Sequence, residues 1–254
     1  MKLFDISGKV AIVTGGNGGI GLGMAKGMAS IGAAIVVAGR NAAKAETALA
    51  TLRAMGVRAE FVAVDVSKGD QCLKLVADTL ALFGRVDILV NNAGMSVRKR
   101  PEDLTEAEWH AVMDTNLTSA FLCSKAVYEP MKRQGGGKII NTGSMMSLFG
   151  TAYASPYASS KGGIVQLGRS LATAWAQDNI QVNAVLPGWI ETDLTNAARA
   201  QVEGLYERQL GRTPAGRWGV PDDLAGIAAF LASPASDFIT GAAIPVDGGF
   251  SIQG

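Results

Sequence analysis

The sequence predicts an α/β protein in which a parallel sheet of seven strands is doubly wound, with helices on both faces. Short runs rich in β-branched residues alternate with longer segments of helical period, and glycine or proline stands at most junctions between them. Apolar residues make up 48% of the chain and charged residues 18%, which is enough to bury a sheet on both faces. The 254 residues contain no repeat, linker or break in composition, so we expect a single domain over residues 1–254.

Seven runs have the length and composition of buried strands. They are 10–14, 34–38, 59–65, 86–91, 138–142, 180–186 and 243–247. Connections between parallel strands are right-handed, so these runs predict an open sheet whose ligand crevice lies beyond the carboxyl ends of the strands.

Segments of helical period separate these runs. They are 20–30, 42–55, 68–83, 106–132, 155–176 and 222–231. The segment 190–220 contains no clear strand, and we expect a long, mobile loop there that covers the substrate.

The charge balance narrows the class of partner. Lysine and arginine number 23 against 22 for aspartate and glutamate, which gives no electrostatic reason to expect nucleic acid or an anionic membrane as partner. No run approaches the ~18 apolar residues of a membrane helix, and the start of the chain, MKLFD, leads into a charged segment without the apolar stretch of a secretory signal. We therefore expect a cytoplasmic protein that acts on a small molecule.

Histidine and cysteine are scarce. His110 is the only histidine, which excludes His-rich zinc sites and, unless His110 itself serves, Ser-His-Asp hydrolysis in its usual form. Cys72 and Cys123 are far apart in the sequence, so we expect two reduced, buried thiols and no metal site.

A glycine-rich turn, TGGNGGIG at 14–21, joins the first predicted strand to the first predicted helix. Glycines let the backbone approach a pyrophosphate, whose charge is favoured by the free N–H groups at the start of a helix. The turn fits both G-x-G-x-x-G and T-G-x-x-x-G-x-G, and without a ligand it would be a tight turn only. The candidate cofactor-binding residues here are Gly15, Asn17, Gly18, Gly19, Ile20 and Gly21.

A glycine-rich turn between a strand and a helix is typical of sites for the nicotinamide dinucleotides NAD and NADP. The end of the second predicted strand indicates which of the two is preferred. An NAD site usually has a carboxylate about 20 residues beyond the glycines, where this chain has Arg40 and Asn41. A guanidinium can make a forked contact with a 2′-phosphate, so we expect NADP(H) to be preferred, with NAD(H) possible. The alternative is a solvated Arg40 beside an Asn41 that caps the next helix.

Tyr157 and Lys161 stand four residues apart in the predicted helix 155–176, so both side chains lie on one face. A nearby ammonium favours the phenolate, so we expect Lys161 to lower the pKa of Tyr157 and make it a general acid and base. Ser144, just beyond the strand 138–142, can donate a hydrogen bond to the oxyanion that forms when hydride adds to a carbonyl.

Together with Asn116 in the segment DTNL, this Ser and Tyr-x-x-x-Lys arrangement resembles the catalytic tetrad of the short-chain dehydrogenase/reductase family, whose members have a Rossmann-type fold. The resemblance covers nearly the whole chain, with its motifs in the expected order. It implies that Tyr157 is the acid and base, that Ser144 orients the substrate oxygen, that Lys161 also holds the nicotinamide ribose, and that Asn116 holds a water that links Lys161 to solvent.

The resemblance also implies further cofactor contacts and an assembly. Asp65 and Val66 would lie by the adenine, and the segment Asn92, Ala93 and Gly94 would border the cofactor; without the family, these are a helix cap and a turn. The residues implied to lie by the nicotinamide carboxamide are Pro187, Gly188, Ile190 and Thr192. A homotetramer is implied, paired through the helices 106–132 and 155–176 and, at a second interface, through 243–247 and the C-terminus.

Substrate choice is expected to come from the loops 95–101, 145–156 and 190–220. The segments SMMS at 144–147, PAGRWG at 214–219 and VDGGF at 246–250 resemble sugar-acid members of the family, such as gluconate 5-dehydrogenases and 2-deoxygluconate 3-dehydrogenases. The basic triplet 98–100 could attract a carboxylate or simply be a solvated loop. A 3-oxoacyl thioester reductase and a broad ketone reductase remain open, as does a cofactor-binding sensor without chemistry, although a sensor has no need of Tyr157 and Lys161.

Overall fold

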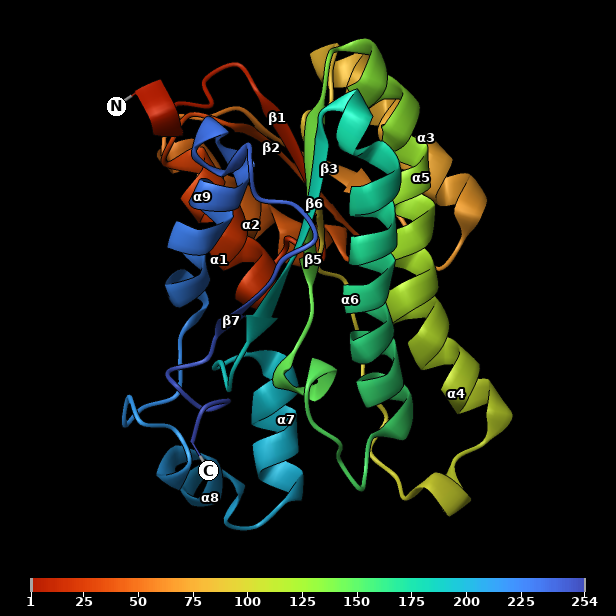
Figure 1. Ribbon diagram of the computed structural model, residues 1–254, viewed down its shortest axis with the longest axis vertical. Helices are drawn as coiled ribbons and strands as arrows, with labels where there is room; N and C mark the ends of the chain where they lie inside the picture. Colours follow the sequence, from red (N-terminus) through yellow and green to blue (C-terminus); the bar gives the residue numbers. More distant parts are fainter. Residues whose placement is uncertain (1, 254) are drawn as a thin grey trace.

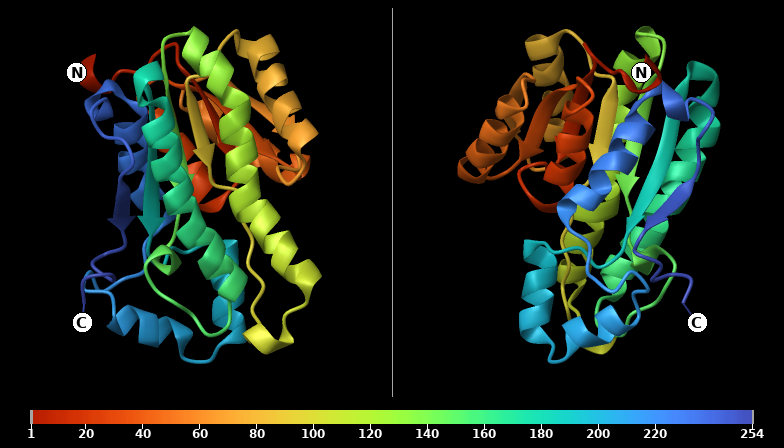
Figure 2. Two further views of the ribbon diagram at one scale, coloured as in Figure 1. Left: turned by 45° about the vertical axis from the view of Figure 1, so that its right-hand side comes forward. Right: turned by 90° about the vertical axis from the view of Figure 1, so that its left-hand side faces the viewer.

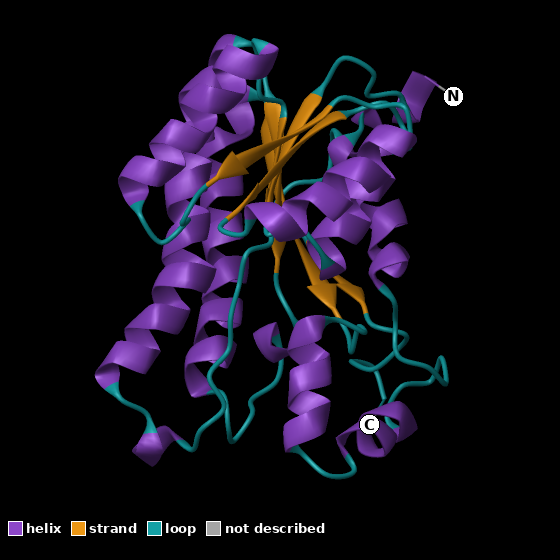
Figure 3. Ribbon diagram, turned by 180° about the vertical axis from the view of Figure 1, so that it is seen from behind, coloured by secondary structure: helices purple, strands orange, loops and turns teal. Residues whose placement is uncertain are grey.

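The computed structural model describes residues 2–253; residues 1 and 254 of the predicted domain lie outside this range. A seven-stranded parallel sheet stands between two layers of helices (Figures 1 and 3). The strands are β1 (Val10–Thr14), β2 (Ala34–Gly39), β3 (Ala59–Ala63), β4 (Ile88–Asn91), β5 (Gly137–Thr142), β6 (Ile180–Pro187) and β7 (Ala243–Val246). The predicted fold class, a doubly wound Rossmann-type sheet in one domain, is confirmed.

The strand order is β3-β2-β1-β4-β5-β6-β7, so the direction of winding reverses between β1 and β4. All the pairs are parallel, with Val13 of β1 opposite Val37 of β2 and Val90 of β4. The carboxyl ends of all seven strands therefore lie at one edge of the sheet, and ligands bind such sheets beside the point of reversal.

The helices cover both faces of the sheet. Their bounds are α1 (Gly19–Ala29), α2 (Ala42–Ala54), α3 (Gly69–Phe83), α4 (Glu106–Met113), α5 (Ser119–Arg133), α6 (Ser155–Trp175), α7 (Asp193–Gln201), α8 (Leu205–Gly211) and α9 (Ala225–Ala232). Helices α1, α2 and α9 pack on one face, and α3, α5 and α6 pack on the other. The predicted helix 106–132 is divided by a π-helical turn, Asp114–Thr118, between α4 and α5.

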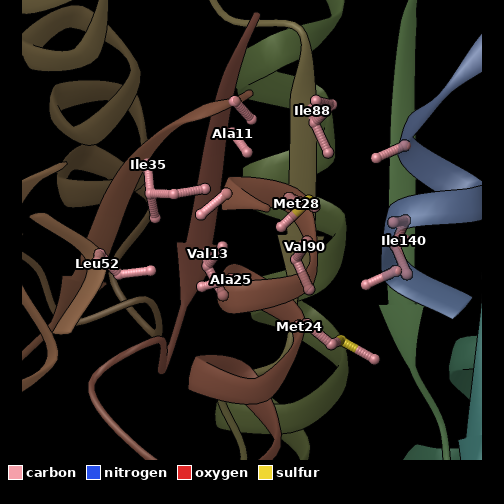
Figure 4. Packing of buried hydrophobic residues seen from close by; sticks show 14 of the residues in the cluster. Ala11, Val13, Met24, Ala25, Met28, Ile35, Leu52, Ile88, Val90 and Ile140 are labelled. Atoms are coloured by element: carbon pink, nitrogen blue, oxygen red, sulfur yellow. The ribbon is translucent and has the colours of Figure 1, made fainter. Parts of the chain in front are cut away.

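The core follows the two faces of the strands. In Figure 4, side chains of α1 pack over the central strands, with Leu52 of α2 at the side. The fully buried residues drawn there include Ala11, Val13, Met24, Met28, Ile35, Ile88 and Val90. Alternate residues of β1 face opposite layers, because Ile12 belongs to the cluster under α3 and α5. The five inner strands are therefore buried on both faces, whereas the edge strands β3 and β7 are only partly buried.

The segment 190–220 is not the long, mobile loop that the sequence predicts. It forms two short helices, α7 and α8, which lie beyond the carboxyl ends of the strands (Figure 2). A parallel bridge between Ile190 and Gly219 closes the base of the segment. Thr192 begins α7 by accepting a hydrogen bond from the Thr195 N–H, and the Thr195 hydroxyl donates to the Ile190 carbonyl. The segment is therefore a folded cap, held by local hydrogen bonds.

Cys72 of α3 and Cys123 of α5 are free, buried thiols whose sulfur atoms lie 3.5 Å apart. Across residues 2–253, histidine, cysteine and acidic side chains nowhere gather in threes as a metal ion would need. The same range contains no helix with both the length and the apolar character required to cross a membrane.

Candidate functional site

A cavity of about 570 Å³ lies at the carboxyl edge of the sheet, between the strands and α7. It runs from the glycine-rich turn to the start of α6. The predicted site residues that line it are Gly15, Asn17, Gly18, Gly19, Ile20, Asn92, Ala93, Gly94, Ser144, Tyr157, Lys161, Pro187, Gly188, Ile190 and Thr192. The predicted residues outside its lining are Gly21, Arg40, Asn41, Asp65, Val66 and Asn116.

The glycine-rich turn is shaped by positions that exclude a side chain. Gly15 and Gly19 have left-handed backbone conformations, with φ of +64° and +51°. A Cβ atom on Gly21 would lie 2.5 Å from both the Asn92 Nδ2 and the Gly15 carbonyl oxygen. Gly18 precedes α1 without a side-chain cap, so the first N–H groups of that helix are not covered by a capping side chain. These residues form a cradle that fits a dinucleotide pyrophosphate.

Thr14 and Asn92 join the turn to the end of β4. The Thr14 hydroxyl donates to the Val90 carbonyl at 3.1 Å and accepts from the Asn92 N–H at 2.9 Å and the Ala93 N–H at 3.1 Å. The Asn92 Nδ2 donates to the Thr14 carbonyl at 3.0 Å. The two strand ends at the point of reversal are therefore held in one position, which also fixes the cradle.

The residues predicted for the adenine end follow β2 and β3, the two strands on one side of β1, which leads into the turn. Asn41 caps α2 by accepting from the Lys44 N–H at 2.9 Å, and Arg40 is exposed. Asp65 accepts hydrogen bonds from the hydroxyl and N–H of Ser67, and the hydroxyl contact lowers the pKa of the Asp65 carboxyl. The side-chain oxygen of Asn41 therefore caps α2, which was the alternative expected from the sequence. The guanidinium of Arg40 is exposed and accessible to a ligand.

Lys44 was missed from the sequence. It lines the cavity, and its Nζ would lie 3.4 Å from a Cβ on Gly18. The same ammonium pairs with Asp193 of α7 at 2.5 Å. Its position in the sequence could have indicated this role, because Lys44 lies one turn after Asn41, at the amino end of the helix that follows β2.

Tyr157 and Lys161 lie on the same face of α6 and reach the same cavity, as their spacing predicts. The Lys161 Nζ lies 5.6 Å from the centre of the Tyr157 ring and donates to the Thr142 carbonyl at 2.6 Å. Burial lowers the pKa of Lys161 to about 8. Burial also raises the pKa of Tyr157, while its hydrogen bond with Ser144 acts in the opposite direction. The predicted lowering of the Tyr157 pKa by Lys161 is therefore wrong for this structure, because desolvation of the phenolate outweighs the hydrogen bond from Ser144 and Lys161 is not among the causes of the shift.

Ser144 follows β5 in an extended conformation and lines the cavity next to Tyr157. Its hydroxyl oxygen accepts from the Met146 N–H at 3.1 Å. One lone pair is thereby occupied, and the hydroxyl proton remains available to a group in the cavity.

Asn116 lies in the π-helical turn, 1% exposed. Its Oδ1 accepts from the Met95 N–H at 2.8 Å, and its Nδ2 donates to the Met95 carbonyl at 2.9 Å and to the Ser160 hydroxyl at 3.0 Å. Both amide protons are therefore bound by protein, and the side chain does not reach the cavity. A water linked to Lys161 would have to use another atom of this turn.

The substrate side of the cavity is formed by the three predicted loops. Residues that the sequence analysis did not name individually as site residues include Ser96, Met146, Thr151, Leu194, Ala197, Ala198 and Gln201. The last four recur at helical spacing along α7, which is the signal that could have found them. Of the basic triplet, Arg98 lines the cavity, whereas Lys99 pairs with Glu108 and Arg100 pairs with Glu102.

Comparison with known proteins identifies the chain. A family model described as enoyl-(acyl carrier protein) reductase matches residues 15–251. A 2-dehydro-3-deoxy-D-gluconate 5-dehydrogenase of Formosa agariphila is 42% identical over 250 residues, which cover 98% of this chain and 95% of the relative. The chain belongs to the short-chain dehydrogenase/reductase family.

Further relatives of this short-chain dehydrogenase/reductase agree in sequence and fold. A gluconate 5-dehydrogenase of Gluconobacter oxydans is 38% identical and covers 99% of this chain and 98% of its own. The crystal structure of a gluconate 5-dehydrogenase from Burkholderia cenocepacia, in complex with NADP and tartrate, superposes with a TM-score of 0.93 at 40% identity, covering 99% and 98% of the two chains. The protein is therefore an oxidoreductase that acts on CH–OH groups with a nicotinamide cofactor.

Proposed function

We propose that this protein interconverts a carbonyl and a secondary alcohol of a sugar acid with NADP(H). The observation that carries the proposal is that Ser144, Tyr157 and Lys161 line the same cavity as the glycine cradle. The names of the relatives from Formosa and Gluconobacter, both sugar-acid dehydrogenases, support the substrate class. A non-catalytic sensor has no use for this arrangement of a phenol, an ammonium and a hydroxyl.

In this reaction a bound nicotinamide supplies or accepts the hydride. The Tyr157 hydroxyl gives its proton to the substrate oxygen during reduction and takes it back during oxidation. Ser144 donates a hydrogen bond to the same oxygen while negative charge develops there. Lys161, mostly protonated at pH 7 with its pKa of about 8, places a positive charge 5.6 Å from the centre of the Tyr157 ring and would bind the ribose hydroxyls of the cofactor.

The raised pKa of Tyr157 favours reduction at neutral pH, because the phenol is then protonated and ready to donate. Alcohol oxidation requires the phenolate, so its rate is expected to rise from pH 7 to pH 10 while the reduction rate does not. Initial rates in both directions over this range test the assignment, and an oxidation rate that falls with pH would contradict it.

The decisive experiment is Tyr157→Phe. The variant keeps the ring and its packing but has no proton to transfer, so we expect turnover to fall by about 10³-fold or more while NADPH binding, followed by fluorescence, changes less than about threefold. Near-normal turnover in this variant would refute the proposed function.

The cradle residues Gly15, Asn17, Gly18, Gly19 and Ile20 would hold the pyrophosphate, with Gly21 supporting them. Arg40 and Asn41 would face the 2′-phosphate, and Asp65 and Val66 the adenine. The residues that would flank the nicotinamide half are Asn92, Ala93, Gly94, Pro187, Gly188, Ile190 and Thr192.

The 2′-phosphate assignment has its own test. Arg40→Ser is expected to lower the ratio of kcat/KM for NADPH over NADH by about 10-fold or more, because one charge-assisted forked contact is lost. Lys44→Met is the matched control, since Lys44 also lies near the cradle but pairs with Asp193. A larger loss of the NADPH preference in the Lys44 variant would assign the 2′-phosphate to Lys44 instead.

Arg98 is the group that we propose to bind the substrate carboxylate. It is the member of the basic triplet that lines the cavity, and its neighbours in the triplet are paired with glutamates. Arg98→Met is expected to raise KM for 5-keto-gluconate by about 10-fold or more and to leave KM for an uncharged ketone within about twofold. Activity of the unchanged protein on acetoacetyl thioesters alone would replace the sugar-acid assignment with a thioester reductase.

We further propose that the protein is a cytoplasmic homotetramer. Each chain would form a single functional domain over residues 1–254, in which the segment 190–220 covers the substrate. Exposed apolar side chains support the two interfaces: Phe121 is 44% exposed on α5, and Phe238 and Ile252 near β7 are 104% and 86% exposed. Free thiols at Cys72 and Cys123 support a reducing compartment, and the balanced charge gives no reason to propose a nucleic-acid partner. Sedimentation velocity and cell fractionation test these points.

A further inference from the structure

The hydroxyl of Ser147 lies between the loop that carries Ser144 and the helix that carries Tyr157 and Lys161. Its Oγ donates to the Lys161 carbonyl at 2.6 Å and accepts from the Ser144 N–H at 3.2 Å. The short turn Met145–Ser147 thus holds Ser144 at its amino end and is attached to α6 at its carboxyl end.

These contacts fix the direction of each hydrogen bond. Carbonyl oxygen can only accept, so the single proton of Ser147 goes to Lys161, and a lone pair of Ser147 receives the Ser144 N–H. The Ser144 oxygen in turn accepts from the Met146 N–H, so its own proton is directed away from the turn. Ser147 therefore helps to present Ser144 to the cavity as a donor, which is what a developing oxyanion requires.

The other end of this loop is already fixed. The Gly143 N–H donates to the Val185 carbonyl of β6 at 2.8 Å, and a Cβ on Gly143 would lie 2.3 Å from Leu186 Cδ2 and 3.0 Å from the Ser147 Oγ. The loop is thus anchored to the sheet before Ser144 and to α6 after it. Without the Ser147 hydroxyl, the Ser144 N–H loses its acceptor and the link to α6 is absent.

We propose that Ser147 is a positioning residue that sets the distance and direction of Ser144 relative to Tyr157 and Lys161. This inference rests on the proposed function, which gives those three residues their roles. Ser147 does not line the cavity and acts through Ser144. Small displacements of a donor lower a rate strongly, because the stabilisation of a developing charge depends on the geometry of the hydrogen bond.

A double-mutant cycle tests the inference. Ser147→Ala, Ser144→Ala and the combined variant are assayed for kcat, KM and NADPH binding, with Ser159→Ala, an exposed position of α6, as the matched control. We expect Ser147→Ala to lower kcat about 10-fold to 100-fold in the unchanged protein and less than about twofold in the Ser144→Ala background. NADPH affinity should stay within about twofold throughout.

Three results would overturn the inference. The first is a kcat of Ser147→Ala equal to that of Ser159→Ala. The second is the same fold-loss of kcat in both backgrounds, and the third is a loss of NADPH affinity as large as the loss of kcat. Either of the last two would indicate general damage to the fold. The variant Tyr157→Phe distinguishes a failure of this inference from a failure of the proposed function. An inactive Tyr157→Phe together with a fully active Ser147→Ala would refute only the role of Ser147.

Discussion

Replacement of Lys161 by methionine should make the stability of the protein depend on pH in a defined way. Lys161 is 4% exposed, and burial lowers its pKa to about 8 from 10.5. The ammonium is thus more costly in the folded state than in the unfolded state, where it is hydrated. Methionine has a similar length and carries no charge, so Lys161→Met removes this cost.

The sign follows from the proton balance. Between pH 8 and pH 10.5 the unfolded chain binds more protons at this position than the folded chain, so the free energy of unfolding rises with pH through this window. The depression of about 2.5 pKa units corresponds to about 3 kcal/mol below pH 8. At pH 10 less than about 1 kcal/mol of it remains. At each pH the variant is compared with the unchanged protein. Lys161→Met should therefore raise the free energy of unfolding by about 2.5 kcal/mol more at pH 7 than at pH 10.

Urea denaturation of both proteins without ligands, at one protein concentration and at both pH values, measures this difference. Other titrating groups contribute almost equally to both proteins and cancel in the comparison. The lost hydrogen bond to the Thr142 carbonyl adds an offset that does not vary with pH. A difference that stays constant within about 0.5 kcal/mol from pH 7 to pH 10 would show that Lys161 is not desolvated and would refute the reasoning.

Two further variants test the supports of the site. Gly21→Ala places a methyl group 2.5 Å from the Asn92 Nδ2 and should destabilise the protein by about 1–3 kcal/mol in thermal unfolding, whereas Gly226→Ala, with open space around it, should not destabilise it. Equal melting temperatures for the two variants would contradict the close packing of the cradle. Asp87→Ala removes a 5% exposed carboxylate that accepts from the Val10 N–H and holds two cations, and should cost about 2 kcal/mol in urea denaturation. A loss below about 0.5 kcal/mol would show that water replaces these contacts.

The strands were predicted well because each is a short run rich in apolar and β-branched residues, and the differences lie at the ends. The predicted strand 59–65 ends at Ala63, since β3 is an edge strand that pairs only with β2, whose last residue is Gly39. The predicted strand 86–91 begins at Ile88, where its pairing with Ala11 of β1 and Lys138 of β5 starts. Ends of strands depend on partners that are distant in sequence, so their exact limits do not follow from local composition.

The helical segments show where periodicity fails. A π-helical turn adds one residue to a turn without changing the polarity of the sequence, so the division of 106–132 at Asp114–Thr118 left no pattern to read. Helices α7 and α8 are short, and among their residues only Leu205 is buried, so the apolar stripe that normally reveals a helix is almost absent. Helix α7 is stabilised by the Thr192 cap, whereas α8 has no side-chain cap and is held by the buried Leu205 and by the contact of the Tyr206 ring with Trp218.

The sequence by itself determined the doubly wound sheet, the glycine cradle and the pairing of Tyr157 with Lys161 on one helical face. These depend on spacing along the chain and on backbone preferences that each residue carries with it. Only the tertiary structure decided that burial raises the pKa of Tyr157, that Arg98 and not its neighbours lines the cavity, and that Ser147 joins Ser144 to α6. Solvation, ion-pair choice and hydrogen-bond direction depend on which atoms meet across segments that are distant in sequence, and spacing along the chain does not encode them.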